Sequence, residues 1–276
     1  MKCFNCHKEI CDLIKRGKLL NDNLIPIKQH SKGISEYLSY GRQDTKIYHW
    51  YHIGGSILEI KYNGITYDTS FEWCRPSYES EKEKQQVYSS LVNEISFFLY
   101  VFNGLECLIT KTPELNIGNT SKKFELADKI IATKINQTLC SDKYLNDLVV
   151  LYKEIGIVLF DDFKFLLKKS KNICTTFIYH IRNKISHGDF VFPETGDYPP
   201  YSKLYPLLIN LCSRLTLIST QYLLLSTISK SSFFGLYYSS IIKCYNDFED
   251  GYLINDIDYL NNIHLKEVEW EKLIRE

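Results

Sequence analysis

Apolar residues recur at alternating steps of three and four over most of the chain after residue 84, and this period predicts amphipathic helices. The longest apolar stripe consists of Tyr88, Leu91, Ile95, Phe98, Phe102, Leu105 and Ile109, and it ends at Thr112-Pro113. Further stripes predict helices over 148–166, 173–188, 204–229 and 232–246, with a weaker helix over 121–139. Long stripes with short connections are typical of an antiparallel helical bundle.

The first 80 residues follow a different pattern. Residues 1–45 are mixed and predict no definite element, whereas 57–62 and 65–73 are rich in β-branched and aromatic residues. The Asn63-Gly64 pair between them suits a two-residue turn and predicts a β-hairpin. Because Ser80 is a candidate helix N-cap, we place a boundary near residue 80. The expected fold is mainly α: an α+β module over 1–80, a helical bundle over 81–246 and an acidic tail or helix over 247–276.

Composition and charge narrow the function classes. The 276 residues are 45% apolar and 24% charged, which is ordinary for a soluble globular protein. Lys+Arg and Asp+Glu both number 33, so the formal net charge is zero. Because non-specific binding to nucleic acid depends on neutralising phosphates, a neutral chain needs a local basic patch to bind RNA or DNA.

The cysteines and the most apolar segment indicate in which cellular compartment the protein is expected. The nine cysteines are mostly scattered singly through apolar segments, and no signal peptide is visible, which favours a reducing cytoplasm. The 204–229 segment carries Asn210, Arg214 and Gln221, so it suits a buried bundle helix better than a lipid-facing span. We expect a cytoplasmic protein without a membrane segment.

Candidate chemistry concentrates in one stretch, residues 177–190. It holds Arg182, Asn183 and His187 within six residues, with His180 and Lys184 beside them. Gly188 follows directly and is a helix-stop signal. No other segment combines a permanent cation, an amide and a titratable imidazole so closely.

Helix geometry divides these residues between two directions. His180, Asn183 and His187 are spaced to share one side of a helix, whereas Arg182 lies roughly 140° away from His187. Either the helix ends at His187, so that the imidazole can swing, or a second copy of the chain completes the site.

These residue types suit RNA cleavage by internal attack of a 2′-hydroxyl. Histidine can transfer protons near neutral pH, arginine can stabilise charge that grows on the phosphate, and an amide can orient either group. The segment 164–187 also contains Lys168, Lys169 and Lys171 and no acidic residue, so it predicts a local patch that attracts phosphate. This reaction requires no metal, and we expect no cofactor.

The string Arg182-Asn183-x-x-x-His187 resembles the R-N-x3-H motif of the HEPN superfamily. The resemblance covers residues 84–230 and implies a helical bundle and a metal-independent endoribonuclease. It also implies a homodimer with two motifs in one composite site, and a role as a toxin or in anti-phage defence. An antitoxin or an activating phage factor would then be a further partner. Family members often carry an acidic residue on an earlier helix, for which Glu94 and Glu106 are both candidates.

Other interpretations stay open at this stage. Arg182 and His187 also suit an ordinary helix end, where cations offset the helix dipole. A bundle of this kind could instead bind RNA without cleaving it, or act as a scaffold or antitoxin. Cys3-x-x-Cys6 supplies half of a zinc site, with no second clean pair, so free cysteines are the default expectation.

Overall fold

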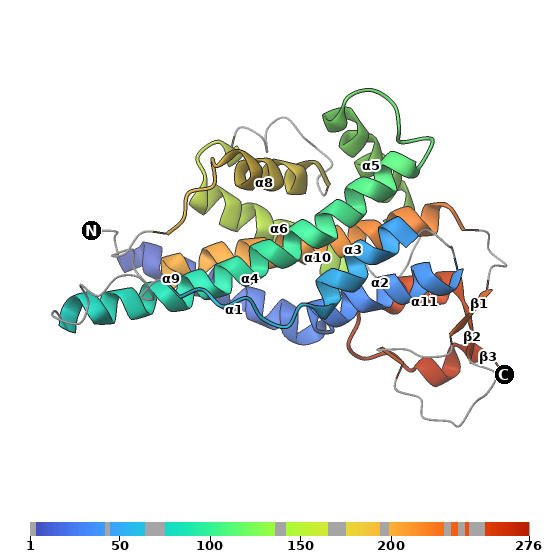
Figure 1. The fold of residues 1–276 in the computed structure, drawn as a ribbon, viewed down its shortest axis with the longest axis horizontal. Helices are drawn as coiled ribbons and strands as arrows, with labels where there is room; N and C mark the ends of the chain where they lie inside the picture. The colour runs from blue at the N-terminus through green and yellow to red at the C-terminus, as the bar shows by residue number, and fades with distance from the viewer. Residues whose placement is uncertain are drawn as a thin grey trace.

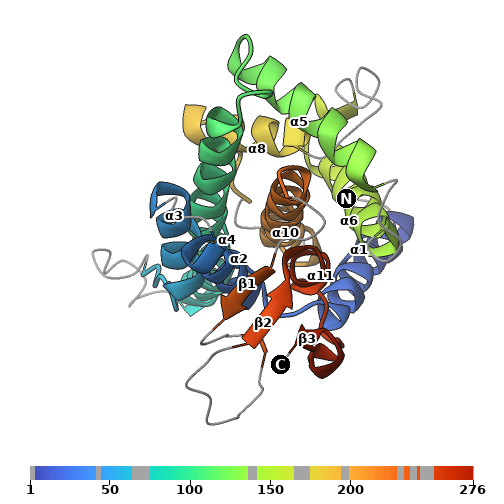
Figure 2. The same cartoon turned by 90° about the vertical axis from the view of Figure 1, so that its right-hand side faces the viewer.

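Helix α10 (Leu204–Ser226) lies in the middle of the molecule, and the other long helices surround it (Figure 2). The computed structural model describes residues 4–41, 45–63, 75–135, 142–164, 175–193, 199–228, 233–236, 241–242 and 252–275. The helices before α10 are α1 (Phe4–Asn23), α2 (Ile27–Gly41), α3 (Thr45–Ser56), α4 (Arg75–Lys111), α5 (Thr120–Ile135), α6 (Asp142–Leu159), α8 (Thr175–His187) and α9 (Pro199–Ser202). The elements after it are β1 (Phe233–Leu236), β2 (Tyr252–Asn255), α11 (Asp256–Asn262), the 3-10 helix η2 (Trp270–Lys272) and β3 (Ile274–Arg275) (Figure 1). The prediction of a mainly helical bundle is confirmed.

Helix α10 is central because its side chains are buried on every side. It packs against α1, α2, α4, α5, α6, α8, α9 and α11. By length and composition α10 and the 84–111 part of α4 could each cross a membrane, but 89% of the most apolar window of α10 is buried in the protein. A core helix passes the same test, and the polar residues of α10 fit that interpretation because Arg214 and Gln221 hydrogen-bond inside the bundle.

Helix α4 begins earlier than its apolar stripe predicts. It starts at Arg75 and continues without a break to Lys111, so the predicted N-cap Ser80 and the predicted boundary near residue 80 fall inside the helix. Proline is tolerated in a first helical turn, where its missing N–H leaves no hydrogen bond unmade, and Pro76 occupies that turn here. The predicted stop at Thr112-Pro113 is confirmed.

The first predicted strand of the hairpin is not a strand. Residues 57–63 have no regular secondary structure, and residues 65–73, the second predicted strand, lie outside the described residues. The Asn93 side chain on α4 pairs with both the N–H and the C=O of Ile60, each at 2.7 Å. Gln85 and Ser89 donate to the carbonyl of Tyr62. Side chains of α4 thus provide the hydrogen bonds that a partner strand would supply.

Helices α1, α2 and α3 occupy most of the described residues up to 56, a region for which no definite element was predicted up to residue 45, and they belong to the common core. Ile10, Leu13 and Leu20 of α1 are buried, while Gly17 interrupts the apolar stripe. A Cβ on Gly17 would lie 2.7 Å from Leu207 of α10, so the glycine allows the two helices to approach closely. Helix α2 buries Tyr37 against Tyr259 of α11, with ring centroids 6.3 Å apart.

The C-terminal part of the chain departs from the prediction of a helix over 232–246. Phe233–Leu236 instead forms β1, which pairs antiparallel with β2, and β2 pairs with β3 in the order β1-β2-β3. The expected acidic tail packs on the bundle: Leu265 bridges to Leu24, and Trp270 is buried. Helix α11 has Asn255 as its N-cap, whose side chain accepts from the N–H of Ile257 at 2.9 Å.

A buried polar network connects α10 with the helices on one side of it. Gln221 contacts His30 of α2 at 2.6 Å and His264 at 3.2 Å, and its amide also donates to the carbonyl of Leu260. Burial lowers the pKa of both histidines, that of His264 to about 4, and the nearby Arg214 lowers both further. The two rings are therefore neutral at pH 7.

We expect this network to make the fold sensitive to acid. A histidine has a pKa near 6.5 in the unfolded chain, so between about pH 6.5 and 4 the unfolded state binds the proton and the folded state does not. The free energy of unfolding is therefore highest above about pH 6.5, and it decreases as the pH falls from there to about 4. His264 alone should cost about 2 kcal/mol of unfolding free energy near pH 5. Urea denaturation at several pH values measures this loss.

A matched pair of variants tests the acid prediction. His264→Gln should flatten the fall in stability between neutral pH and about pH 5. His49→Gln, at an exposed position on α3, should leave the fall unchanged. The same pH dependence in His264→Gln as in the unaltered chain would contradict the assignment.

Candidate functional site

Helix α8, which carries the Arg182-Asn183-x-x-x-His187 motif, is anchored at its N-terminus by a buried carboxylate from α5. Asp128 accepts from the N–H and hydroxyl of Thr175 at 2.6 and 2.8 Å, and from those of Thr176 at 3.2 and 2.6 Å. Burial raises the pKa of Asp128, and these hydrogen bonds oppose the rise. A negative charge at this end also complements the helix dipole. The contact fixes the position of α8 against α5.

The C-terminus of α8 is confirmed where the sequence predicts it. The helix ends at His187, and Gly188 has a φ of +79°, the left-handed conformation that glycine adopts without steric cost. The N–H of Phe190 then donates to the carbonyl of Lys184 at 3.0 Å. The Phe190 ring is buried 5.8 Å from that of Phe160 and holds the returning chain in place.

Arg182 faces helix α4. Its guanidinium lies 5.5 Å from the centre of the Phe102 ring, and its Nη2 is 3.8 Å from Oε2 of Glu106. Nη1 donates to the side-chain oxygen of Asn183 at 3.2 Å. The Arg182 side chain remains 28% exposed, so the cation is held in position and is still accessible. The structure therefore brings Arg182, Asn183 and Glu106 together.

His180 and Lys184 face the turn that follows α6. Lys184 forms an ion pair of 2.7 Å with Asp162, and its ammonium lies 5.3 Å from the centre of the Phe160 ring. His180 is about half buried, and burial lowers its pKa, with Asp162 and Lys184 acting in opposite directions. Since Asp162 neutralises Lys184, this lysine contributes less to phosphate attraction than the sequence suggests.

His187 is exposed in the last turn of α8. Among the residues that the structure describes, its ring makes no hydrogen bond or ion pair, and nothing links it to Arg182. The motif is thus divided as helix geometry predicts: Arg182 is held against α4, while His187 projects into solvent next to Gly188. One chain does not bring the two groups into contact.

The two acidic candidates on α4 have different environments. Glu106 lies beside Arg182, whereas Glu94 is partly buried and accepts from the side-chain amide of Asn210 on α10 at 3.1 Å. Burial raises the pKa of Glu94, while Asn210 and the charge of Arg214 oppose the rise. Glu106 is therefore the acidic residue at the motif, and Glu94 belongs to the core.

Several predicted features lie outside the described residues. Lys168, Lys169 and Lys171 of the expected basic patch are among them, as are Cys3 and the side chain of Cys6 from the half zinc site. Within the described part of the chain, no cluster of three or more His, Cys, Asp or Glu could hold a metal ion. The zinc interpretation remains a prediction.

Asp128 is the residue at this site that sequence reasoning missed. It lies in a weakly amphipathic helix some 47 positions before its partner Thr175, and no local pattern connects the two. The Thr175-Thr176 pair at the start of α8 is the one visible signal, since hydroxyl residues favour helix N-termini. Comparison of the chain with protein-family models, curated proteins and solved structures finds no match.

Proposed function

We propose that this protein is a metal-independent endoribonuclease whose site is built on the last two turns of α8. The observation that carries the proposal is an accessible arginine, held by Asn183 and Glu106, on the helix turn before an exposed histidine. The 2′-oxygen of RNA would attack the adjacent phosphorus while the bond from phosphorus to the 5′-oxygen breaks. The products are a 2′,3′-cyclic phosphate and a 5′-hydroxyl.

Each motif residue has a role that its chemistry permits. His187 moves the proton between the 2′-hydroxyl and the leaving 5′-oxygen, because an imidazole titrates near neutral pH. Arg182 stabilises the charge that develops on the phosphate oxygens. Asn183 orients the guanidinium, as its hydrogen bond to Arg182 suggests, and Glu106 holds the same cation from α4. His180 and Lys184 would contact the RNA beside the cleaved bond.

The proposed active form is a homodimer. Arg182 is held against α4 while His187 projects away, so a second motif would supply the group that one chain does not bring into contact. Val191 and Phe192 follow the motif and are 63% and 45% exposed. Burying two such side chains at an interface would be favourable. The resemblance to the HEPN superfamily supports a dimer, and with it a cytoplasmic role as a toxin or in anti-phage defence.

The alternative is a bundle of the same type that binds RNA, or serves as a scaffold or antitoxin, without cleaving anything. The observation that favours a scaffold or antitoxin role is the pairing of Lys184 with Asp162 and of Arg182 with Glu106. Each carboxylate reduces the positive potential that a phosphate would meet.

The deciding experiment incubates the purified protein with total RNA, with and without EDTA, and determines the chemistry of the product ends. We expect cleavage in both conditions and cyclic phosphate ends. His187→Ala and Arg182→Ala should each reduce the cleavage rate by about a hundredfold or more. His49→Ala, which removes an exposed histidine on α3, should leave the rate unchanged.

Binding assays on the same variants separate the two functions. His187→Ala should retain most of its RNA affinity while it loses cleavage, because a proton-transfer group contributes little to binding. Cleavage that disappears with EDTA would contradict the metal-independent mechanism. Binding without cleavage of any RNA by the unaltered chain would favour the alternative.

A further inference from the structure

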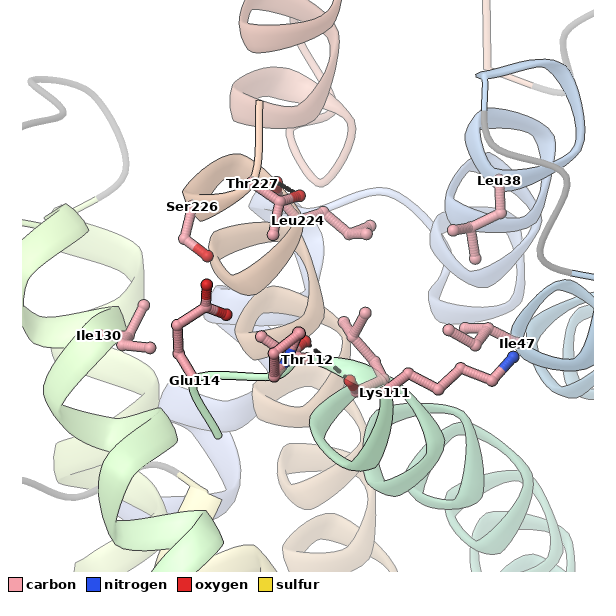
Figure 3. Close-up of a pocket in the computed structure, with 11 residues that line it drawn as sticks. Leu38, Ile47, Lys111, Thr112, Glu114, Ile130, Leu224, Ser226 and Thr227 are labelled. Carbon is pink, nitrogen blue, oxygen red and sulfur yellow. Dashed lines mark hydrogen bonds between the residues drawn. The ribbon is translucent and has the colours of Figure 1, made fainter. Parts of the chain in front are cut away.

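A cavity of about 690 Å³ opens where the C-termini of α4 and α10 meet α2, α3 and α5 (Figure 3). Aliphatic side chains form one part of its lining: Leu38, Ile47, Leu108 and Leu224 are buried, and Ile130 of α5 closes the opposite side. The other part is mostly polar and consists of Lys111, Thr112, Pro113, Glu114, Ser226 and Thr227. Pockets that hold small ligands range from about 300 to 1,000 Å³ and are lined mainly by apolar side chains. The size and lining suit a small molecule with an apolar body.

One acidic group stands at the rim of this cavity. The exposed side chain of Glu114 points toward Ser226 at the end of α10 (Figure 3). Within the described part of the chain, the Glu114 carboxylate makes no hydrogen bond or ion pair. Ser226 donates its hydroxyl hydrogen to the carbonyl of Leu223 at 2.6 Å, so its oxygen keeps lone pairs that can accept. Carboxylate and hydroxyl oxygens together form an acceptor pair at the rim.

The charges of the described residues around the cavity sum to a negative value. Helix α4 ends at Lys111 and α10 ends at Ser226, and each C-terminus carries the equivalent of about half a negative charge. Glu114 adds a full negative charge. The opposing cation, Lys111, extends toward Ile47 and away from Glu114 (Figure 3). The balance is about one net negative charge, located on the Glu114 side.

We propose that this cavity binds a small organic cation, a primary ammonium attached to an apolar body of about the size of a phenyl ring. The apolar body occupies the space between Leu38, Leu108 and Ile130, and the ammonium lies between Glu114 and Ser226. An ammonium has three donors and no acceptor, which matches the acceptors at the rim. The site is separate from the motif on α8, and the proposal does not depend on RNA cleavage.

Three probes with nearly the same apolar body test the proposal by calorimetric titration of the full chain. They are 2-phenylethylammonium, 2-phenylethanol and 3-phenylpropanoate, which differ in the charge of the polar end. We expect saturable 1:1 binding of the ammonium probe and binding of the other two that is at least about tenfold weaker. Equal binding of all three probes, or no saturable binding of the ammonium probe, would overturn the proposal.

Variants locate the binding. Glu114→Gln should weaken binding of the ammonium probe by about tenfold, because a hydrogen bond between opposite charges is replaced by one from the ammonium to a neutral amide oxygen. Ile130→Trp, which fills the cavity from α5, should abolish it. Glu125→Gln removes an exposed carboxylate of α5 that does not line the cavity, and it should leave binding unchanged. Unaltered affinity in Glu114→Gln, with the fold verified by its melting temperature, would refute the assigned site.

Discussion

Arg214→Ala is expected to lower the free energy of unfolding by about 3–5 kcal/mol, because it removes a buried cation together with two hydrogen bonds and an electrostatic interaction with Glu94. The Arg214 side chain lies in α10, where its Nε donates to the side-chain oxygen of Asn21 at 2.5 Å and its Nη1 to the carbonyl of Ile25 at 3.2 Å. Burial lowers the pKa of Arg214 to about 10, with the nearby Glu94 opposing. Alanine would leave the partly buried Asn21 oxygen, the buried Ile25 carbonyl and the Glu94 carboxylate without this cation.

Urea denaturation of matched variants at neutral pH measures the effect. Arg16→Ala removes an arginine whose side chain is 39% exposed and pairs with Glu154, so it should cost no more than about 1 kcal/mol. Adding Glu94→Gln to Arg214→Ala should recover part of the lost stability, since the neutral amide needs no buried counter-charge. Equal losses in Arg16→Ala and Arg214→Ala would show that burial does not govern this interaction.

Asp128→Ala is expected to cost about 3 kcal/mol and to release the N-terminus of the helix that carries the motif. The four hydrogen bonds from Thr175 and Thr176 all end on this carboxylate, and two of them come from N–H groups that have no partner within the helix. Asp128→Asn keeps the shape and one acceptor oxygen, so it should cost less than alanine. Denaturation and hydrogen exchange of the α8 amides measure the two consequences.

The control for this prediction is Asp147→Ala, at an exposed position on α6, which should change stability by no more than about 0.5 kcal/mol. Faster exchange should be confined to α8 and its neighbours in Asp128→Asn. Uniformly faster exchange over the whole chain would mean that Asp128 supports the fold in general and does not act specifically on α8.

Hydrophobic periodicity located the helices that bury one apolar side, such as α4, α6 and α8, but not all of their bounds. The helix predicted over 148–166 is α6, which begins at Asp142 and ends at Leu159. Periodicity was insufficient for α1 and α2, because Gly17 occupies a position in the α1 stripe and α2 buries polar side chains, His30 and Ser31 among them. Apolar positions alone do not mark a helix face that is closed by a glycine or by hydrogen-bonded residues.

The errors over 57–62 and 232–246 have a different cause. The structure of both segments was predicted from the preferences of their own residues. It is decided instead by hydrogen bonds with distant parts of the chain. Asn93 satisfies the backbone of Ile60 across 33 positions, and β1 pairs with β2 from Phe233 opposite Asn255. The tendency of a residue to form a strand depends largely on what it packs against. The sequence of the segment alone therefore does not show which partner it will have.

At the candidate site too, features within one helix could be predicted from the sequence, whereas features that depend on packing between helices could not. The motif, the helix end at Gly188 and the divergence of Arg182 from His187 follow from spacing along one helix. The choice of Glu106 over Glu94 does not, because both lie on α4 and their distance from α8 depends on how the helices pack. Neutralisation of Lys184 by Asp162 likewise depends on a turn between helices.

The central position of α10 has a consequence for the synthesis of the chain. Helices α1 to α6 leave the ribosome before α10, yet the apolar sides of α4, α5 and α6 are covered by it. Until residue 226 has emerged, the parts of these surfaces that α10 covers stay exposed, and exposed apolar surface on a partly made chain favours aggregation. The order of elements thus leaves the core of the bundle incomplete until most of the chain has been made.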